Sequence, residues 1–246
     1  MNLVLTMAGK YQRFRLFGNK VPKYLMPLGK TTVLWHVLNA LHSVDSDINI
    51  YLLANDSDRD FFPIIKSVMK DFSISQKNIG YISDTKSQLD TAMHIFDVFQ
   101  ELGQDSDSPI AFTSIDTILR HRRCFFDGLA KLGPTSGLID VFPGSSHDYS
   151  YILPEGNGAS NVREIADYHC LSDMACSGLY SFGSVSFFKK NCQSFLKNNK
   201  AGNFTSFYST LLESGYAIHY SHASDVRDTL VLGTPEEYIV NLHRFS

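Results

Sequence analysis

The residues best suited to chemistry lie near the start of the chain. The apolar run Leu3–Met7 leads into Ala8 and Gly9, and Arg13 and Lys23 follow within the next loop. Small residues let a flat ring approach the backbone, and two nearby cations can neutralise phosphates. This pattern is typical of a site for a nucleoside triphosphate, although a solvated basic loop would have the same composition. The segment is neither a GxxxxGK[ST] phosphate loop nor a GxGxxG dinucleotide loop.

A candidate metal ligand follows another apolar run. Asp116 comes shortly after the run Ile110–Ser114. A carboxylate at the end of a strand can hold Mg²⁺, but an Asp in this position can equally cap a turn before Thr117. The nine histidines show neither an HxxxH nor an HExxH pattern, so none of them is assigned to a metal.

Other polar segments allow a functional and a structural interpretation. Gln88 follows Ser87, which can cap a helix, so Gln88 is either a ligand contact or an ordinary first-turn residue. His121-Arg122-Arg123 is the densest basic cluster, and it either meets an anionic substrate or begins a solvated helix. The acids after Thr234-Pro235 indicate the first turn of a helix.

Alternating apolar and amphipathic segments must position these residues. Strands separated by helices predict βαβ units around a mostly parallel sheet, with chemistry at the carboxyl ends of the strands. The expected strands are Leu3–Met7, Ile48–Ala54, Asn78–Ile82, Ile110–Ser114 and Gly137–Phe142, and the expected helices are 32–43, 59–72, 88–102 and 122–132. Beyond residue 143 the pattern predicts a hairpin around Tyr149–Leu153, strands at Gly178–Phe182 and Tyr216–Tyr220, and helices at 185–197, 205–214 and from Pro235.

Composition excludes several classes of protein. The chain has 246 residues, with 22 Lys and Arg against 25 Asp and Glu, and therefore a formal charge of −3. A binder of duplex nucleic acid must neutralise many phosphates, so this balance excludes that class. No stretch approaches the roughly 18 apolar residues of a membrane span, and no signal-peptide pattern opens the chain. The four cysteines have irregular spacing, which predicts free thiols in a cytoplasmic protein.

The order of the motifs resembles a known family. The segments match, in sequence, the landmarks of the sugar-nucleotide-type nucleotidyltransferases, or pyrophosphorylases, and are most similar to small bacterial cytidylyl-, uridylyl- and thymidylyltransferase-like proteins of capsule and surface-polysaccharide pathways. The matching segments are Met7-Ala8-Gly9 with Arg13-Phe14, Pro22-Lys23-Tyr24-Leu25, Thr85–Ala92, Phe112–Asp116, Glu164–Asp167 with Ser177–Phe182, and Leu232–Glu237.

The resemblance implies an α/β fold of three αβα layers, Rossmann-like and similar to the GT-A fold, with a mixed, mostly parallel sheet. It implies a single domain over residues 1–246, in which 1–142 bind the nucleotide and 143–246 bind the acceptor. The implied reaction is an Mg²⁺-dependent nucleotidyl transfer of the EC 2.7.7 type, with Mn²⁺ as an alternative ion. A pyrimidine nucleoside triphosphate (CTP, UTP or dTTP) and a phosphorylated small molecule such as a sugar phosphate would be the substrates, and pyrophosphate would be released.

The resemblance also assigns roles to residues of this chain. Arg13 and Lys23 would be catalytic and Asp116 would hold the metal. The nucleotide would contact Met7, Ala8, Gly9, Gln88 and Ser114, and the acceptor would contact Asp167, Gly178 and Tyr180.

The chain departs from the family pattern at four positions. Tyr11 and Gln12 replace a glycine and a small hydroxyl residue, Tyr168 replaces a lysine, and Val231 stands where many relatives have a second metal-binding Asp. Asp225 and Asp228 are nearby candidates for that second ligand. These departures leave open a catalytically impaired nucleotide-binding regulatory protein. A GT-A-type glycosyltransferase is a further alternative, although Ser114-Ile115-Asp116 is not a DxD motif. The sequence contains no indication of the oligomeric state.

Overall fold

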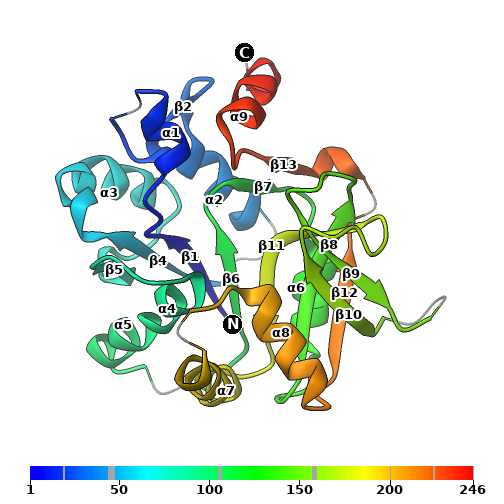
Figure 1. Cartoon of the computed structure of the whole chain (residues 1–246). Coiled ribbons are helices and arrows are strands. Elements are labelled where there is room, and N and C mark those ends of the chain that lie inside the picture. Colours follow the sequence, from blue (N-terminus) through cyan, green and yellow to red (C-terminus); the bar gives the residue numbers. More distant parts are fainter. Residues whose placement is uncertain are drawn as a thin grey trace.

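A mixed sheet forms the centre of the protein (Figure 1). The computed structural model describes residues 1–18, 20–43, 48–104, 107–156, 160–199, 201–223 and 225–245. Within them the main sheet has nine strands: β1 (Asn2–Met7), β4 (Asn49–Asn55), β5 (Ile79–Ile82), β6 (Ile110–Ser114), β8 (Gly137–Pro143), β9 (Ser150–Pro154), β10 (Val162–Asp167), β11 (Met174–Phe182) and β12 (Ile218–His222). The strand order is β10-β9-β11-β6-β1-β4-β5, and β8 pairs with both β11 and β12.

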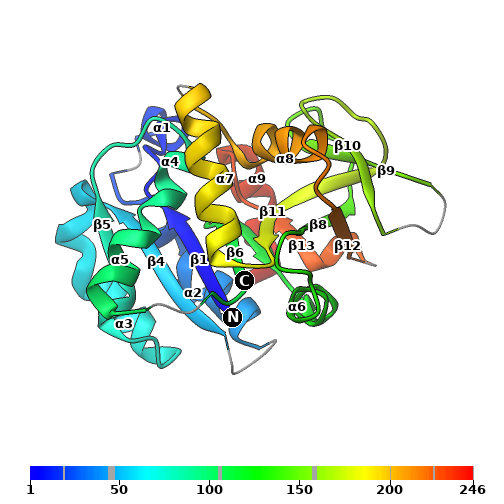
Figure 2. The same ribbon diagram turned by 90° about the horizontal axis from the view of Figure 1, so that it is seen from below.

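Helices cover both faces of this sheet (Figures 1 and 2). They are α1 (Gln12–Leu16), α2 (Val33–His42), α3 (Phe62–Asp71), α4 (Gln88–Met93), α5 (Ile95–Leu102), α6 (Arg123–Ala130), α7 (Val185–Asn198), α8 (Phe204–Glu213) and α9 (Pro235–Leu242). Buried side chains of α2, α3 and α6 form one apolar cluster with one face of the sheet, and those of α4, α5, α7 and α8 form another with the opposite face. The predicted three-layer αβα architecture is therefore confirmed.

Alternating burial explains how one strand serves both layers. In β1, Leu3, Leu5 and Met7 belong to the first cluster, whereas Val4 belongs to the second. This alternation is expected because successive side chains of a strand point to opposite faces. The two helical layers therefore pack against opposite faces of the central strands.

The strands of the first half of the chain that belong to the main sheet, β1, β4, β5 and β6, pair in parallel with one another, as predicted. β1 pairs in parallel with β4 and with β6, and β4 pairs in parallel with β5. The register places Met7 opposite Ala54, and Thr6 opposite Ser114. The loops after these strands consequently emerge at the same edge of the sheet.

The later strands are mainly antiparallel. β9 and β10 form the predicted hairpin, and β11 pairs antiparallel with β6 and β8. The pairing of β11 with β6 makes the sheet continuous across residue 143. β11 is longer than the predicted strand Gly178–Phe182, and the predicted helix 88–102 is divided at His94 into α4 and α5.

Short elements complete the fold. Two two-stranded ladders join β2 (Pro27–Leu28) to β3 (Thr31–Thr32) and β7 (Thr117–Leu119) to β13 (Thr229–Val231), and a 3-10 turn, η1, spans Lys23–Leu25. All four cysteines are free thiols. No helix in the described part of the chain has the length and apolar character needed to cross a membrane.

Candidate active site

The loop after β1 is held in place by side chains beneath it. Tyr11 has a left-handed backbone conformation with φ 49°, a region that glycine favours. Its hydroxyl donates to the Met7 carbonyl oxygen, and its ring meets that of Tyr24 edge-on with centroids 5.9 Å apart. Asn55, at the end of β4, donates to the Ala8 carbonyl oxygen at 3.3 Å. Tyr11, at the position where the family that the sequence resembles has glycine, is therefore folded back against the protein.

Lys23 and Asp116 form an ion pair at the carboxyl ends of β1 and β6. Lys23 Nζ lies 2.6 Å from Asp116 Oδ2 and 3.4 Å from the carbonyl oxygen of Gly233. The Lys23 side chain is 10% exposed and that of Asp116 is 29% exposed. Burial by itself would raise the pKa of Asp116, but the Lys23 ammonium and the Ser114 hydroxyl outweigh it and hold the pKa below its usual value. The carboxylate is therefore ionised at neutral pH and can bind a cation.

The C-terminal segment fixes the position of this carboxylate. The backbone N–H of Leu232 donates to the Asp116 carbonyl oxygen at 2.6 Å. A Cβ atom at Gly233 would lie 3.6 Å from Asp116 Oδ2 and 3.2 Å from Glu237 Oε2, so Gly233 lies between the two carboxylates. Glu237 accepts from the Thr234 backbone N–H at 2.9 Å in the capping box of α9. The last motif of the chain thus both starts a helix, as predicted, and closes one side of the site.

Two adjoining cavities meet above these residues. The first, of about 450 Å³, holds the charged groups Arg13, Lys23 and Asp116. The second, of about 500 Å³, is lined largely by neutral polar side chains and the backbone after β1. Both are lined by Thr6, Gly9, Lys10, Gln12 and Ser114. They therefore form one groove with a charged end, which holds Arg13, Lys23 and Asp116, and a predominantly neutral end, where Lys86 is the charged residue not shared with the first cavity.

Gly9 provides a place for close approach within this groove. A Cβ atom added at Gly9 would meet only the Tyr11 ring, at 3.7 Å, which is ordinary contact. Crowding by the protein therefore does not explain why this residue is a glycine, and the open side of Gly9 is free for a ligand. Arg13 lies exposed on α1 and lines the charged end.

The neutral end lies between α4 and the loop after β5. Ala8, Thr85, Gln88 and Thr91 line it. The Gln88 side chain accepts a hydrogen bond from the backbone N–H of Phe204 at 3.3 Å, so it also joins the start of α4 to the start of α8. Gln88 thus lines the cavity and caps a helix of the second half.

The predicted acceptor residues are only partly brought to the groove. Gly178 has φ +89°, and a Cβ atom there would lie 3.0 Å from the Ser114 hydroxyl, so Gly178 adjoins the groove. Tyr180 is 6% exposed and its ring stacks on Phe204 with centroids 5.0 Å apart. Asp167 accepts from the side chains of Ser150 and Asn203. Tyr180 and Asp167 lie outside the lining of both cavities, and their acceptor role stays a prediction.

The predicted nucleotide contact at Met7 is limited to its backbone. The Met7 side chain is fully buried in the core, and its carbonyl oxygen already accepts from Tyr11. Ala8 and Ser114, in contrast, line the groove. A nucleotide role for these residues remains a prediction.

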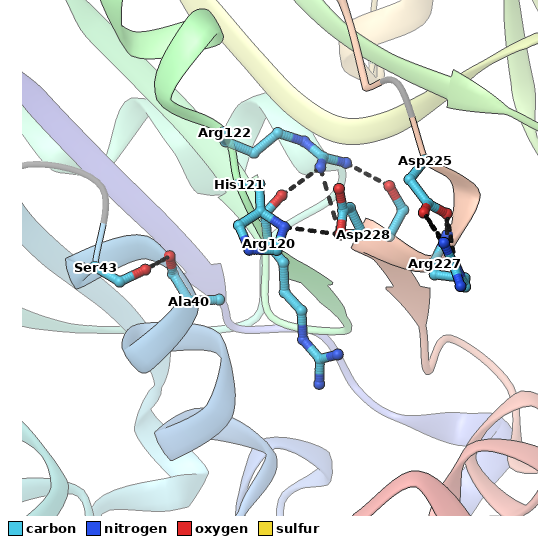
Figure 3. Close-up of polar contacts among 9 residues, drawn as sticks. Ala40, Ser43, Arg120, His121, Arg122, Asp225, Arg227 and Asp228 are labelled. Carbon is cyan, nitrogen blue, oxygen red and sulfur yellow. Dashed lines mark hydrogen bonds and ion pairs between the residues drawn. The ribbon is translucent and has the colours of Figure 1, made fainter.

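The candidate second carboxylates lie elsewhere, so that expectation is wrong. Asp228 accepts from His121 Nδ1 at 2.9 Å, and Asp225 is held by Arg227 (Figure 3). Arg120 donates its backbone N–H to the Asp228 carbonyl oxygen, at the end of the β7–β13 ladder opposite to Val231, which pairs with Thr117 next to Asp116. Asp228 therefore lies at the end of the ladder remote from Asp116, and neither acid lines the groove.

The basic cluster fits the solvated-helix interpretation except at Arg122. Arg123 begins α6 with an exposed side chain, and His121 is exposed as well. Arg122 is 2% exposed and its Nε donates to the fully buried Asp140 at 2.8 Å. Its remaining donors reach the carbonyl oxygens of Arg120 and Asp228 and the Thr229 hydroxyl (Figure 3 shows the first two). Arg122 therefore holds β13 against β7 instead of meeting a substrate or solvent.

Sequence reasoning missed two supporting residues. Asn55 follows an apolar strand, and the parallel pairing of β4 with β1 could have indicated that its side chain reaches the loop after β1. The Tyr149 hydroxyl donates to Glu237 Oε1 at 3.1 Å, which links the hairpin to the start of α9. Nothing in the local sequence around Tyr149 indicates this contact, because the two residues are far apart in the chain.

Comparison with known proteins identifies the fold. No protein-family model and no curated protein matches the chain. The nucleoside-diphosphate-sugar pyrophosphorylase from Vibrio cholerae superposes with a TM-score of 0.84 at 21% identity, covering 99% of this chain and 100% of that one. A UDP-glucose pyrophosphorylase complexed with UDP-glucose gives 0.74 at 12% identity, covering 99% and 97%. The inositol-1-phosphate CTP transferase from T. maritima gives 0.70 at 11% identity, covering 99% and 95%.

These likenesses confirm the predicted fold. The chain has the architecture of sugar-nucleotide pyrophosphorylases over nearly its full length. Two of these solved proteins have names that specify different bases, uracil in one and cytosine in the other, so the fold does not by itself determine the base.

The donor set at Asp116 is suited to one kind of metal site. In the described residues no group of three or more His, Cys, Asp and Glu side chains could hold an ion. Mg²⁺ is usually bound through one or two carboxylates together with the phosphates of a substrate. Asp116 therefore fits a Mg²⁺ ion that arrives with a triphosphate.

Proposed function

We propose that the protein is a nucleotidyltransferase that joins a pyrimidine nucleoside triphosphate to a phosphorylated small molecule, such as a sugar phosphate. A phosphate oxygen of the acceptor attacks the α-phosphorus, the bond from that phosphorus to the bridging oxygen breaks, and pyrophosphate leaves. Such a reaction depends mainly on alignment and on neutralising negative charge. The observation that carries the proposal is the Lys23–Asp116 pair at the charged end of a groove whose other end is largely neutral.

The groove suggests how the triphosphate lies. The base occupies the neutral end beside Gly9 and Gln88, and the phosphates extend toward Lys23 and Arg13. Arg13, exposed at the rim, neutralises the leaving β- and γ-phosphates. Lys23 leaves Asp116 for the α-phosphate or the incoming phosphate, because a phosphate offers its ammonium a second anionic partner.

Release of Asp116 from Lys23 provides the metal ligand. Asp116, with the phosphates, would hold Mg²⁺, which supplies neutralisation of the developing charge. The ion pair therefore keeps both groups ordered before substrate binds, and each finds a new partner in the complex.

The acceptor is placed on the side of the second half. Gly178 lies next to Ser114, and its lack of a side chain leaves room at the junction of the two cavities. Asp167, the last residue of β10, is held by Ser150 of β9 and by Asn203. The product would be an activated precursor for capsule or surface polysaccharide.

A pyrophosphate-release assay tests the proposal. CTP, UTP and dTTP, with ATP and GTP for comparison, are combined with a panel of sugar phosphates and small phosphorylated acceptors in the presence of Mg²⁺. We expect turnover with at least one pyrimidine triphosphate and its loss when the divalent ion is chelated. Absence of turnover with every pair, from protein whose circular dichroism shows it folded, refutes the proposal.

A nucleotide-binding protein without catalysis is the second candidate. In the described part of the chain Asp116 has no second Asp beside it, since Val231 occupies the neighbouring strand position, and Tyr168 is 68% exposed where the related family has lysine. Calorimetry separates the two candidates. Tight nucleotide binding that is independent of Mg²⁺ and is accompanied by no turnover favours the second.

A further inference from the structure

The polarity of Gln88 at the neutral end of the groove is fixed by its neighbour. The backbone N–H of Phe204, at the first turn of α8, lies 3.3 Å from Gln88 Oε1. A backbone N–H can only donate, so the amide oxygen of Gln88 must face it and the orientation of the side chain is determined. The Gln88 NH₂ group is therefore the part left for a ligand, and it offers donors only.

The polarity of Thr85 is fixed in the same way. The Thr91 hydroxyl donates to the Ser87 carbonyl oxygen at 3.2 Å, and the hydroxyl oxygens of Thr85 and Thr91 lie 2.6 Å apart. Each hydroxyl has a single proton, so both bonds exist together only when Thr85 donates to Thr91. Thr85 Oγ1 is then left with lone pairs, and it offers the cavity an acceptor.

We propose that this pair of groups selects a uracil or thymine nucleotide over a cytosine nucleotide. Uracil and thymine have a 4-carbonyl oxygen, which accepts, next to an N3–H, which donates. Cytosine has a 4-amino group, which donates, next to an N3 atom that accepts. The donor at Gln88 and the acceptor at Thr85 complement the first edge and oppose the second at both positions. The inference rests on the proposed function, which places a pyrimidine in this cavity.

The two mismatches define the size of the effect. Each protein hydrogen-bonding group that a bound base leaves unpaired lowers the affinity for that base on the order of 10-fold. Two opposed groups therefore predict that kcat/KM for UTP or dTTP exceeds that for CTP by about 100-fold.

Base preference is measured first in the wild-type protein. Steady-state kcat/KM is determined for UTP, dTTP and CTP with one acceptor, and nucleotide binding is measured in parallel by calorimetry with Mg²⁺. Equal or better use of CTP overturns the inference and leaves the proposed function intact. Absence of both binding and turnover for all three refutes the proposed function itself, and the inference falls with it.

Substitutions then test the assigned groups. Glu in Gln88→Glu still accepts from the Phe204 N–H, but it offers the cavity an acceptor, so the ratio of UTP to CTP kcat/KM should fall at least about 10-fold. Gln100→Glu, on the exposed side of α5, is the matched control for the added charge and should leave the ratio unchanged. A Gln88→Glu protein that loses activity equally with both nucleotides shows that Gln88 only supports α8, and this overturns the inference.

Thr85 gives an independent measurement if Gln88→Glu does not fold. Thr85→Val removes the acceptor and should lower the UTP to CTP ratio about 10-fold, whereas Thr85→Ser keeps the hydroxyl and should retain the ratio. An unchanged ratio in Thr85→Val contradicts the assignment.

Discussion

The buried ion pair Arg122–Asp140 provides a prediction about the stability of the fold. The Arg122 side chain is 2% exposed and that of Asp140 is fully buried, with 2.8 Å between Nε and Oδ2. Arg122→Met leaves the Asp140 carboxylate without its cation, and removal of one partner from a buried pair costs about 3–5 kcal/mol. For a chain of this size, each kcal/mol lowers Tm by about 2–4 °C, so we expect a decrease of about 10 °C.

The pH dependence gives a second readout for the same substitution. Burial raises the pKa of Asp140, and Arg122 opposes that rise. In Arg122→Met the largest opposing influence is lost, so the folded-state pKa of Asp140 rises further above the unfolded value. A carboxyl with a raised folded-state pKa is favourable below its unfolded pKa and loses that contribution as the pH rises through the folded pKa. The stability penalty should therefore be larger at about pH 8 than at about pH 5.

Chemical denaturation measures these effects against a neighbouring control. Arg123 is the next residue and the first of α6, is exposed and has Asp127 at 3.9 Å, so Arg123→Met should change the free energy of unfolding by less than about 0.5 kcal/mol. Replacing both partners, in Arg122→Met with Asp140→Leu, should recover most of the loss, because no charge is left buried. An Arg122→Met penalty below about 1 kcal/mol, or one independent of pH, refutes this account.

Three further predictions concern the groove. Lys23→Met and Asp116→Asn should each lower turnover by about 10²-fold, or about 3 kcal/mol, because both act on the phosphates, and wild-type rates in either protein contradict the assigned roles. Tyr11→Phe loses the hydroxyl bond to the preceding turn, so the free energy of unfolding should fall by about 1 kcal/mol and KM for the nucleotide should rise; an unchanged KM shows that the loop does not depend on that bond. Gly178→Ala should lower the stability of the protein more than Gly18→Ala does. Both positions have positive φ, but a Cβ at Gly178 would lie 3.0 Å from the Ser114 hydroxyl, while one at Gly18 would have nothing within 4 Å. Equal decreases of Tm in thermal denaturation would contradict the crowding argument.

The fold was largely predictable from the sequence because its signals are local. The apolar runs that became β1 and β6 are short and bounded by small or polar residues, and burial on both faces explains their continuous apolar character. The division between α4 and α5 was not predictable, because the helical pattern continues through His94. The extension of β11 to Met174 was also missed, since its first half gains strand structure only by pairing with β8 and β9.

The site residues that could be predicted from the sequence are charged residues in the loops that follow predicted strands. Lys23 and Asp116 were singled out separately, and their contact at 2.6 Å depends on the parallel pairing of β1 with β6, which the structure shows and the sequence analysis did not predict. Arg122 was misinterpreted because a buried arginine and a solvated one look alike in a basic run. Only the long-range partner Asp140 on β8 distinguishes the two cases.

The departures at Tyr11 and Val231 change the site in different ways. Tyr11 keeps the left-handed backbone that a glycine would adopt, and the bond to Met7 together with the Tyr24 ring holds the residue there. The loop geometry is thus retained through side-chain contacts. Val231 has no such substitute, because the nearest candidate acids are held by His121 and Arg227 at the other end of the ladder.

The remaining charge near Asp116 explains how one carboxylate can still serve a triphosphate. Lys23 offsets the negative charge of Asp116 in the free protein, and Gly233 separates Asp116 from the carboxylate of Glu237. Glu237 is itself occupied by the Thr234 N–H and the Tyr149 hydroxyl, so it adds negative potential without being a free ligand. The charge of Glu237 would therefore strengthen the binding of a divalent ion at Asp116 without coordinating it, because opposite charges attract more strongly through the partly buried interior than through water. Glu237→Gln should accordingly raise the Mg²⁺ concentration needed for half-maximal turnover by less than Asp116→Asn does. An equal increase for the two proteins in a titration of Mg²⁺ would show that Glu237 is a direct ligand.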